Sequence, residues 1–216
     1  MNVDTLLHQY FPEGEKVLIE MFDEKNIQSV YRRLVGVLLH QPDIETSLLQ
    51  GMSYCFYEVM DNVIIHSGKP NGIVMTSYSE DDSIIRILVA DDGVGIRASL
   101  SENPSFANLS EEQALETCIK DSVSDGRGMG FGLYSTARLI DTAGHKLIIR
   151  SGSHTLSSNG KVVISESDFW QGTVVFFELK SNADINPASV VEHRTDPEGE
   201  FDVLFLDDDT ELDNLW

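Results

Sequence analysis

The sequence predicts an α/β domain that is followed by an acidic C-terminal extension. Two stretches, 27–39 and about 46–65, carry apolar residues at helical spacing, and several shorter stretches alternate or run apolar with Val, Ile and Phe, as strands do. In addition, a glycine-rich stretch at 126–133 leads without a break into a third apolar helical pattern. The 216 residues allow one good-sized domain with an appendage.

The composition argues against several classes of protein. The formal net charge of −21 speaks against nucleic acid or an anionic membrane surface as the main partner, because both need basic patches. No apolar run approaches the roughly 20 residues that span a bilayer, and the N-terminus has no basic or apolar leader, so we expect neither membrane insertion nor secretion. Cys55 and Cys118 lack metal-ligand spacing, and we expect reduced thiols in a cytoplasmic protein.

The N-terminal half predicts two helices and three strands, whereas residues 1–14 give little signal. In chain order, we expect a short strand at 15–21, a helix at 27–39, a long helix from about 46 to 65, and a hairpin of two strands at 73–79 and 83–90. The turn signals at 42–43 and 67–72 separate these elements. We therefore expect a strand–helix extension at 1–43 and a main domain at 44–180.

The second half contains the glycine-rich stretch and the remaining strands. The polar stretch 97–125 includes a helical piece at 110–119, which Ser110 and Gln113 open as a capping box. Because long connections between ligand loops are often mobile, we expect 97–125 to be a lid. We expect the next helix to end near Ala143 with Gly144 as its C-cap, followed by strands at 146–151, 160–165 and 173–180.

The composition changes again after residue 180. Between Asp184 and Trp216, eleven acidic residues stand against Arg194 alone, which gives this stretch a net charge of −10. One interpretation of 181–216 is a disordered acidic linker and tail that aids solubility. The other is a short motif that docks on a partner, a second subunit or the body itself, and the apolar island at 201–206 slightly favours docking.

The glycine-rich stretch Gly126-Arg127-Gly128-Met129-Gly130-Phe131-Gly132-Leu133 is the first candidate site. Glycine at this density allows another group to approach the backbone closely. A helix that begins directly after it offers unpaired N–H groups and the positive end of a dipole, which together favour an anion such as phosphate. The alternative is a flexible loop without a ligand.

The second candidate is a row of polar residues on the long helix. Glu58, Asn62 and His66 follow one another at intervals of four residues and therefore share one helix face. Such a row is often only the solvated side of an amphipathic helix. These residue types have specific chemistry, however: a carboxylate can orient or deprotonate a nucleophile, an amide oxygen suits Mg²⁺, and a histidine can donate to phosphate.

The third candidate is Asp91-Asp92-Gly93-Val94-Gly95-Ile96, which follows the second strand of the hairpin. A carboxylate at a strand end, followed by two glycines, suits the floor of a pocket in which the backbone approaches a flat ligand. When this motif is considered alone, an ordinary Asp-Gly turn is the better explanation.

Taken together and in this order, the motifs resemble those of the GHKL ATPase superfamily. That superfamily unites the ATP-binding domains of type II topoisomerases, a heat-shock chaperone, sensor histidine kinases and a mismatch-repair protein. The stretches 58–66, 91–96 and 126–133 resemble its N, G1 and G2 boxes, and Gly172-Thr173 resembles the Gly-Thr pair that begins its final strand. The resemblance covers about 44–179 and implies a two-layer α/β sandwich, in which a mixed, mostly antiparallel sheet has helices on one face.

The resemblance also implies roles for single residues. Asp91 would accept a hydrogen bond from the adenine amino group with the help of Thr173, and Gly93 and Gly95 would let the backbone approach the base. Asn62 would hold the Mg²⁺ that bridges the phosphates of ATP, and Glu58 would orient or activate the nucleophile. The other residues expected at the nucleotide are His66 and Arg127 near the phosphates, Ile96, Gly128, Met129, Gly130, Phe131, Gly132 and Leu133.

The short build favours the stand-alone ATP-binding proteins of bacteria, including anti-sigma-factor serine kinases, because neither a phosphoacceptor helix nor a transducer domain is recognised. We expect the protein to bind Mg·ATP and to couple this binding to slow hydrolysis or to phosphoryl transfer to a partner protein. A homodimer is a further possibility. Two alternatives stay open. One is a nucleotide-gated interaction module without significant turnover, and the other is a detached histidine-kinase catalytic domain.

Overall fold

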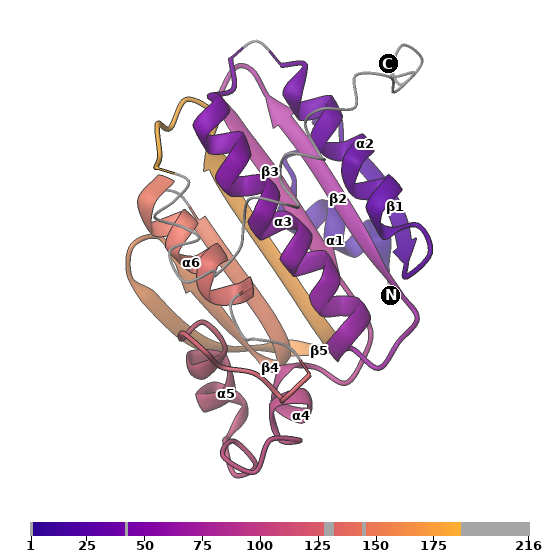
Figure 1. Ribbon diagram of the computed structural model, residues 1–216, viewed down its shortest axis with the longest axis vertical. Helices are drawn as coiled ribbons and strands as arrows, with labels where there is room; N and C mark the ends of the chain where they lie inside the picture. Colours follow the sequence, from indigo (N-terminus) through magenta and orange to yellow (C-terminus); the bar gives the residue numbers. More distant parts are fainter. Residues whose placement is uncertain (1, 42, 128–131, 144–145, 187–216) are drawn as a thin grey trace.

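The computed structural model describes residues 2–41, 43–127, 132–143 and 146–186. Its centre is a five-stranded sheet with the strand order β1-β2-β3-β5-β4, in which all neighbouring strands are antiparallel (Figure 1). The strands are β1 (Leu18–Asp23), β2 (Asn71–Ser79), β3 (Ile84–Ala90), β4 (Lys146–Ser158) and β5 (Val162–Lys180). The helices are α1 (Val3–Tyr10), α2 (Ile27–Leu39), α3 (Thr46–His66), α4 (Ile96–Leu100), α5 (Glu111–Cys118) and α6 (Gly132–Ala143).

The larger hydrophobic core lies between the sheet and the helices α2, α3 and α6. Every second residue of β3, namely Ile85, Ile87 and Val89, belongs to this core, as the period of two in a strand requires. From the helix side, Met52 and Phe56 of α3 are fully buried against the sheet. The α/β sandwich expected from the sequence is thereby confirmed, and in the described residues its sheet is antiparallel throughout rather than mixed.

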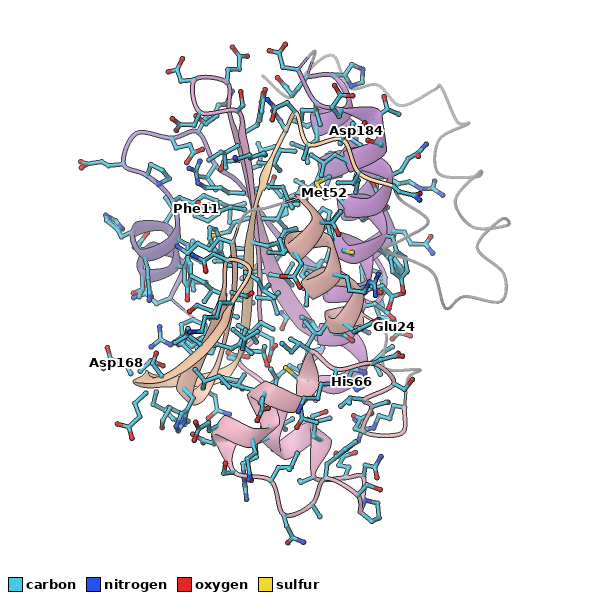
Figure 2. All side chains as sticks on the ribbon, turned by 90° about the vertical axis from the view of Figure 1, so that its left-hand side faces the viewer. Phe11, Glu24, Met52, His66, Asp168 and Asp184 are labelled. Atoms are coloured by element: carbon cyan, nitrogen blue, oxygen red, sulfur yellow. The ribbon has the colours of Figure 1, made fainter. Side chains whose placement is uncertain are left out.

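The short helix α1 covers the opposite face of the sheet. The N-terminal residues that form it show only a weak pattern of apolar residues in the sequence. Leu6 and Tyr10 of α1, together with Phe11, pack on Met75 and Phe176 from the strands. Figure 2 shows Phe11 and Met52 on opposite sides of the sheet. An eight-residue helix has little stability of its own, so this contact with the sheet decides that α1 forms.

The N-terminal segment shares the sheet and core of the main domain. β1 pairs with β2 from Leu18 opposite Thr76 to Asp23 opposite Asn71. The apolar side of α2 belongs to the same buried cluster as α3. The two elements that the sequence predicts at 15–21 and 27–39 are therefore integral parts of the sandwich.

The C-terminal strands differ from the expectation. The two strands expected at 160–165 and 173–180 are one strand, β5, which pairs with β4 as a long hairpin. The register shifts between Ser151 and Gly152 and again before His154, which marks a bulge where the hairpin leaves the sheet. The part of β5 that pairs with β4 beyond the bulge is exposed or half-buried, so this part of the sequence lacks the apolar run of a core strand.

Two further findings concern single elements. The capping box at the start of α5 is confirmed, since Ser110 accepts from the Gln113 N–H and the Gln113 side chain accepts from the Ser110 N–H. No helix in the described part of the chain is long and apolar enough to cross a membrane. Gly144 and the acidic tail beyond residue 186 lie outside the described residues.

Candidate functional site

A cavity of about 420 Å³ lies between α3, the end of β3, the inner part of β5 at Thr173 and Val175, and the segment 96–127. This volume is in the range of small-ligand and cofactor sites. Of the residues expected at the nucleotide from the sequence, those that line the cavity are Glu58, Asn62, His66, Asp91, Gly95, Ile96, Arg127, Gly132, Leu133 and Thr173. Gly93 does not line it, and Gly128, Met129, Gly130 and Phe131 lie outside the described residues.

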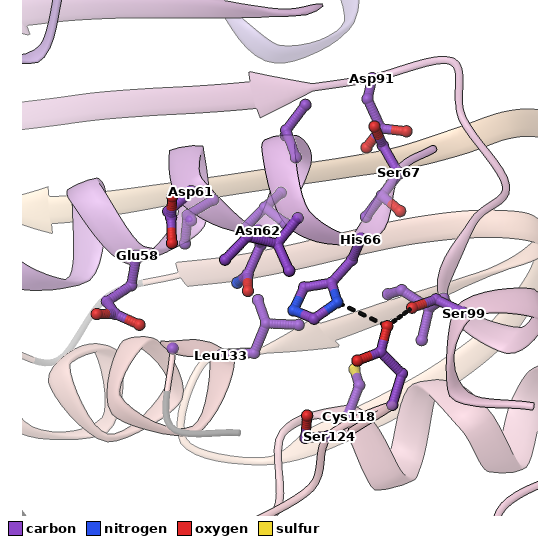
Figure 3. Close-up of a pocket in the computed structure, with 18 of the residues that line it drawn as sticks. Glu58, Asp61, Asn62, His66, Ser67, Asp91, Ser99, Cys118, Ser124 and Leu133 are labelled. Carbon is purple, nitrogen blue, oxygen red and sulfur yellow. Dashed lines mark hydrogen bonds and ion pairs between the residues drawn. The ribbon is translucent and has the colours of Figure 1, made fainter. Parts of the chain in front are cut away.

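The polar row of α3 forms one wall of this cavity. Glu58, Asn62 and His66 all face it, as their spacing of four residues predicts (Figure 3). The first residue of α6 packs closely on the same wall, because a Cβ atom at Gly132 would lie 3.0 Å from Asn62 Nδ2 and 3.3 Å from Glu58 Oε2. The absence of a side chain at Gly132 therefore leaves room for both polar groups beside the start of a helix.

Asp91 forms the floor of the cavity directly after β3. Its side chain accepts a 2.7 Å hydrogen bond from the Gly93 N–H, and only 3% of the residue is exposed. Burial raises the pKa of Asp91 to about 6, although the backbone N–H groups of Gly93 and Thr173 oppose this rise. A buried carboxylate of this kind is a candidate hydrogen-bond acceptor for a donor group of a ligand.

Three glycines allow the backbone to close around Asp91, and protein atoms explain each of them. At Gly93, a Cβ atom would lie 2.1 Å from the Ser67 carbonyl oxygen, so the backbone at the end of α3 needs this space. Gly95 has φ +78° and sits against the Ser151 hydroxyl and the Gly172 carbonyl. At Gly172, with φ +93°, a Cβ atom would lie 2.4 Å from the Asp91 carbonyl oxygen. These contacts give the glycines a structural reason beyond the approach to a base that the sequence suggested.

The end of the segment expected to be a lid is tied to α3. Asp125 accepts a 2.7 Å hydrogen bond from His66 Nδ1 and a 2.9 Å hydrogen bond from the Ser99 hydroxyl (Figure 3). Burial raises the pKa of the Asp125 carboxyl, but these bonds and the Arg127 N–H together outweigh it and hold the pKa below its ordinary value. One carboxylate thus joins α3, α4 and the start of the glycine-rich stretch.

Arg127 lines the cavity and also has partners in the protein. Its guanidinium forms an ion pair with Glu102 of the segment 97–125 and donates to the Ile65 carbonyl oxygen at 3.3 Å. The arginine therefore connects the segment 97–125 to α3, and it is the last described residue before the gap at 128–131.

Sequence reasoning missed several polar residues that line the cavity, among them Tyr54, Asp61, Ser67, Ser99, Ser124 and Asp125. Asp125 directly precedes the glycine-rich stretch, which is a position that could have drawn attention to it. Ser99 carried no signal, because it lies in the short helix α4 that the sequence did not predict.

The oxygen atoms of the cavity suit a hard cation that takes most of its ligands from water and from the phosphates of a bound substrate. Among the described residues, no three His, Cys, Asp or Glu side chains form a metal-binding group. Mg²⁺ usually keeps several waters and takes only one or two protein oxygens together with substrate phosphates. The amide of Asn62 beside the carboxylate of Glu58, with space for a ligand at Gly132, fits that type of site.

A comparison with known protein families gives a match. Residues 49–183 match the family described as histidine kinase-, DNA gyrase B- and HSP90-like ATPase, and this range covers more than half of the chain. The matched range contains the polar row of α3, Asp91, the glycine-rich stretch and Gly172. A comparison with curated proteins found no match.

Proposed function

The chain belongs to the family of histidine kinase-, DNA gyrase B- and HSP90-like ATPases, and from this premise we propose that it is a regulatory protein that binds Mg·ATP. The family supports an ATP-binding domain of the GHKL type. The proposal adds that ATP binding is coupled to slow hydrolysis or to phosphoryl transfer to a partner protein.

One observation carries the proposal: a single cavity contains both a buried acceptor and a polar wall. Asp91 and Glu58 lie at opposite sides of the close-up in Figure 3, with His66 between them. A nucleotide with its base on Asp91 and its phosphates toward α3 would use both groups at once. A purely apolar pocket, or a polar row without a floor, would not offer this combination.

The residues of the wall suggest how the chain acts on the bound nucleotide. Asn62 would supply an oxygen to Mg²⁺, which neutralises phosphate charge when it is bound. Glu58 would orient the attacking water or acceptor hydroxyl, and the imidazole of His66 would donate to a phosphate oxygen. Phosphoryl transfer depends mainly on positioning and electrostatics, so these few groups are sufficient for slow chemistry.

The hydrogen bond between His66 and Asp125 favours a second candidate function. Because the lid segment is joined to the wall of the cavity, nucleotide binding could change the surface of the lid without any turnover. In that case the protein is a nucleotide-gated interaction module. A detached histidine-kinase catalytic domain is the remaining alternative, which differs in the residue that accepts the phosphate.

The first experiment is calorimetric titration of Mg·ATP into the wild type and into Asp91→Asn. The Asn variant keeps an acceptor for the Gly93 N–H but replaces the second carboxylate oxygen by a donor, which opposes the adenine amino group. We expect at least tenfold weaker binding in Asp91→Asn. Asp92→Asn, which carries the same change at a neighbour that does not line the cavity, should bind as the wild type does. No binding by folded wild-type protein would contradict the proposal.

The second experiment separates turnover from gating. Glu58→Gln should keep nucleotide affinity and lose hydrolysis, whereas Glu112→Gln on the exposed side of α5 should change neither. Wild-type protein that binds Mg·ATP and hydrolyses none, alone or with its partner, would favour the gated module. Acid-labile transfer to a partner would indicate phosphohistidine and thus the histidine-kinase alternative.

A further inference from the structure

A second hollow of about 750 Å³ lies at the far end of β2 from the nucleotide cavity. The residues that line it belong to the connection from α1 to β1, the end of α2, and the turn between β2 and β3. None of the motifs discussed above falls in this region, and the proposed ATP site does not use it.

The hollow surrounds an open edge of the sheet. β1 begins at Leu18 opposite Thr76, so the last residues of β2, Ser77–Ser79, pair with β3 only, as far as the described residues show. Alternation along β2 places Ser77 on the face of α1 and Tyr78 on the face of α2, where Tyr78 packs against the larger core. Both residues line the hollow, which therefore wraps around the strand edge.

Three buried polar atoms in this region have no hydrogen-bond partner among the described residues. They are Glu15 Oε2, the Ser77 hydroxyl and the Tyr78 hydroxyl. Ser77 is 5% exposed and the Glu15 side chain 9% exposed, so bulk water reaches neither freely. Native structures rarely leave such groups unsatisfied, and a concentration of them at one hollow points to a missing partner.

The buried arginine nearby does not fill this role. Arg86 donates to Glu15 Oε1 at 2.7 Å and to Glu178 Oε1 at 2.9 Å. Its charge is thus shared between two carboxylates, and within the described part of the chain Glu15 Oε2 still lacks a donor. Because a carboxylate oxygen can only accept, the missing partner has to supply at least one N–H or O–H group to Glu15 Oε2.

The rim of the hollow carries negative charge. Of the described residues that line it, Lys16 is the one base, whereas the acids besides Glu15 are Glu13, Glu80, Asp81 and Asp82, all exposed. A cationic donor would therefore be attracted by the rim and would form charge-assisted hydrogen bonds with the buried acceptors. An open strand edge additionally offers backbone groups to an extended chain.

We propose that this hollow binds an extended segment of a partner protein that bears an arginine or lysine. The segment runs along the edge of β2 at Ser77–Ser79, and its basic side chain reaches Glu15 Oε2 with the Ser77 hydroxyl as a further acceptor on the same face, while the Tyr78 hydroxyl bounds the hollow from the other face of the strand. The site lies away from the nucleotide cavity and does not depend on the proposed function.

The test is an NMR titration of the full ¹⁵N-labelled chain with the peptide acetyl-Val-Arg-Val-amide. We expect shifts that concentrate in the amides of 15–18 and 77–82, and binding about tenfold weaker in the double variant Ser77→Ala/Tyr78→Phe. Because the two hydroxyls have no partner among the described residues, this variant should unfold at the same temperature as the wild type or above it. Glu80→Gln/Asp81→Asn should also weaken binding, whereas Glu112→Gln/Glu116→Gln on α5 should leave it unchanged.

Other outcomes would overturn the proposal. These are an absence of shifts in 77–82 at millimolar peptide, equal shifts with acetyl-Val-Glu-Val-amide, or full binding by the double variant. Agmatine, which carries a guanidinium without a peptide backbone, should bind more weakly than the peptide, and equal affinity would indicate a small-amine site instead. Asp91→Asn should bind the peptide normally, so a failure at the nucleotide cavity is distinguished from a failure here.

Discussion

The imidazole of His66 and the carboxylate of Asp125 are joined by a 2.7 Å hydrogen bond across 59 residues of sequence. His66 ends the long helix that forms one wall of the candidate ATP cavity, and Asp125 ends the segment expected to be its lid. Since Ser99 and the Arg127 N–H also donate to Asp125, this carboxylate holds three parts of the cavity together.

Asp125→Ala should release the lid segment. Loss of the acceptor leaves the donors of His66, Ser99 and Arg127 without their partner, which we expect to destabilise the segment by about 2 kcal/mol. Hydrogen exchange in 97–125 should therefore rise about 30-fold while α3 keeps its protection. Asp121→Ala is the matched control, because that exposed carboxylate accepts from the adjacent Ser122 hydroxyl and should not change the exchange of the segment.

The stabilising contribution of the Asp125 carboxylate should decrease at low pH. The pKa of Asp125 is held below its ordinary value, so its contribution to stability is present above about pH 4 and is lost as the pH falls through the lowered pKa. Equal exchange in wild type and Asp125→Ala at neutral pH would show that other contacts hold the segment.

The parts of the fold that the sequence predicts are those with a strong local period. In α3, apolar residues recur at helical spacing, and the same spacing places Glu58, Asn62 and His66 in one row, as observed. The helix Ile27–Leu39 is likewise predicted with the bounds that the structure has. These elements carry their structural information within a few turns of chain.

The parts that the sequence does not predict depend on distant contacts. α1 forms because Leu6 and Tyr10 pack on the back of the sheet, and a window of eight residues does not contain that information. The long hairpin β4–β5 has a mixed pattern because much of it leaves the sheet after the bulge at Gly152. Similarly, the contact of Asp125 with His66 joins positions that no local pattern connects.

Nucleotide affinity should fall as the pH drops below about 6. Burial raises the pKa of Asp91 to about 6, and protonation would convert this proposed acceptor for the adenine amino group into a donor. The affinity of the phosphate-free probe adenosine should therefore decrease by up to about tenfold per pH unit below 6. Adenosine is the appropriate probe because phosphate groups themselves titrate near pH 6.

The free energy of unfolding should change with pH in the opposite direction to nucleotide affinity, because of the same Asp91 carboxyl group. The folded pKa of Asp91 is above its ordinary value of 3.8, so the folded state binds the proton more tightly and this contribution to stability grows as the pH falls from 6 toward 4. Calorimetric titration across pH 5 to 7.5, with thermal unfolding in parallel, checks both signs. An affinity for adenosine that stays constant over this range would remove the ionised Asp91 from recognition of the base.

Two glycines with nearly the same φ angle allow backbone strain to be distinguished from close packing at the floor of the cavity. Gly160 has φ +94°, and a Cβ atom there would meet no atom within 4 Å. Gly172 has φ +93°, and a Cβ atom there would lie 2.4 Å from the Asp91 carbonyl oxygen and 2.6 Å from the Gly93 nitrogen. Gly160→Ala should therefore cost only the backbone strain of about 1 kcal/mol.

Gly172→Ala should add displacement of the backbone around Asp91 to the same strain. We expect it to cost about 3–5 kcal/mol and to abolish nucleotide binding, because Asp91, the proposed acceptor for the base, moves with that backbone. Urea unfolding of both variants, followed by Mg·ATP titration of the folded protein, measures the difference. Equal destabilisation by Gly160→Ala and Gly172→Ala would mean that the Asp91 turn yields easily, and Gly172 would then be required by its φ angle alone.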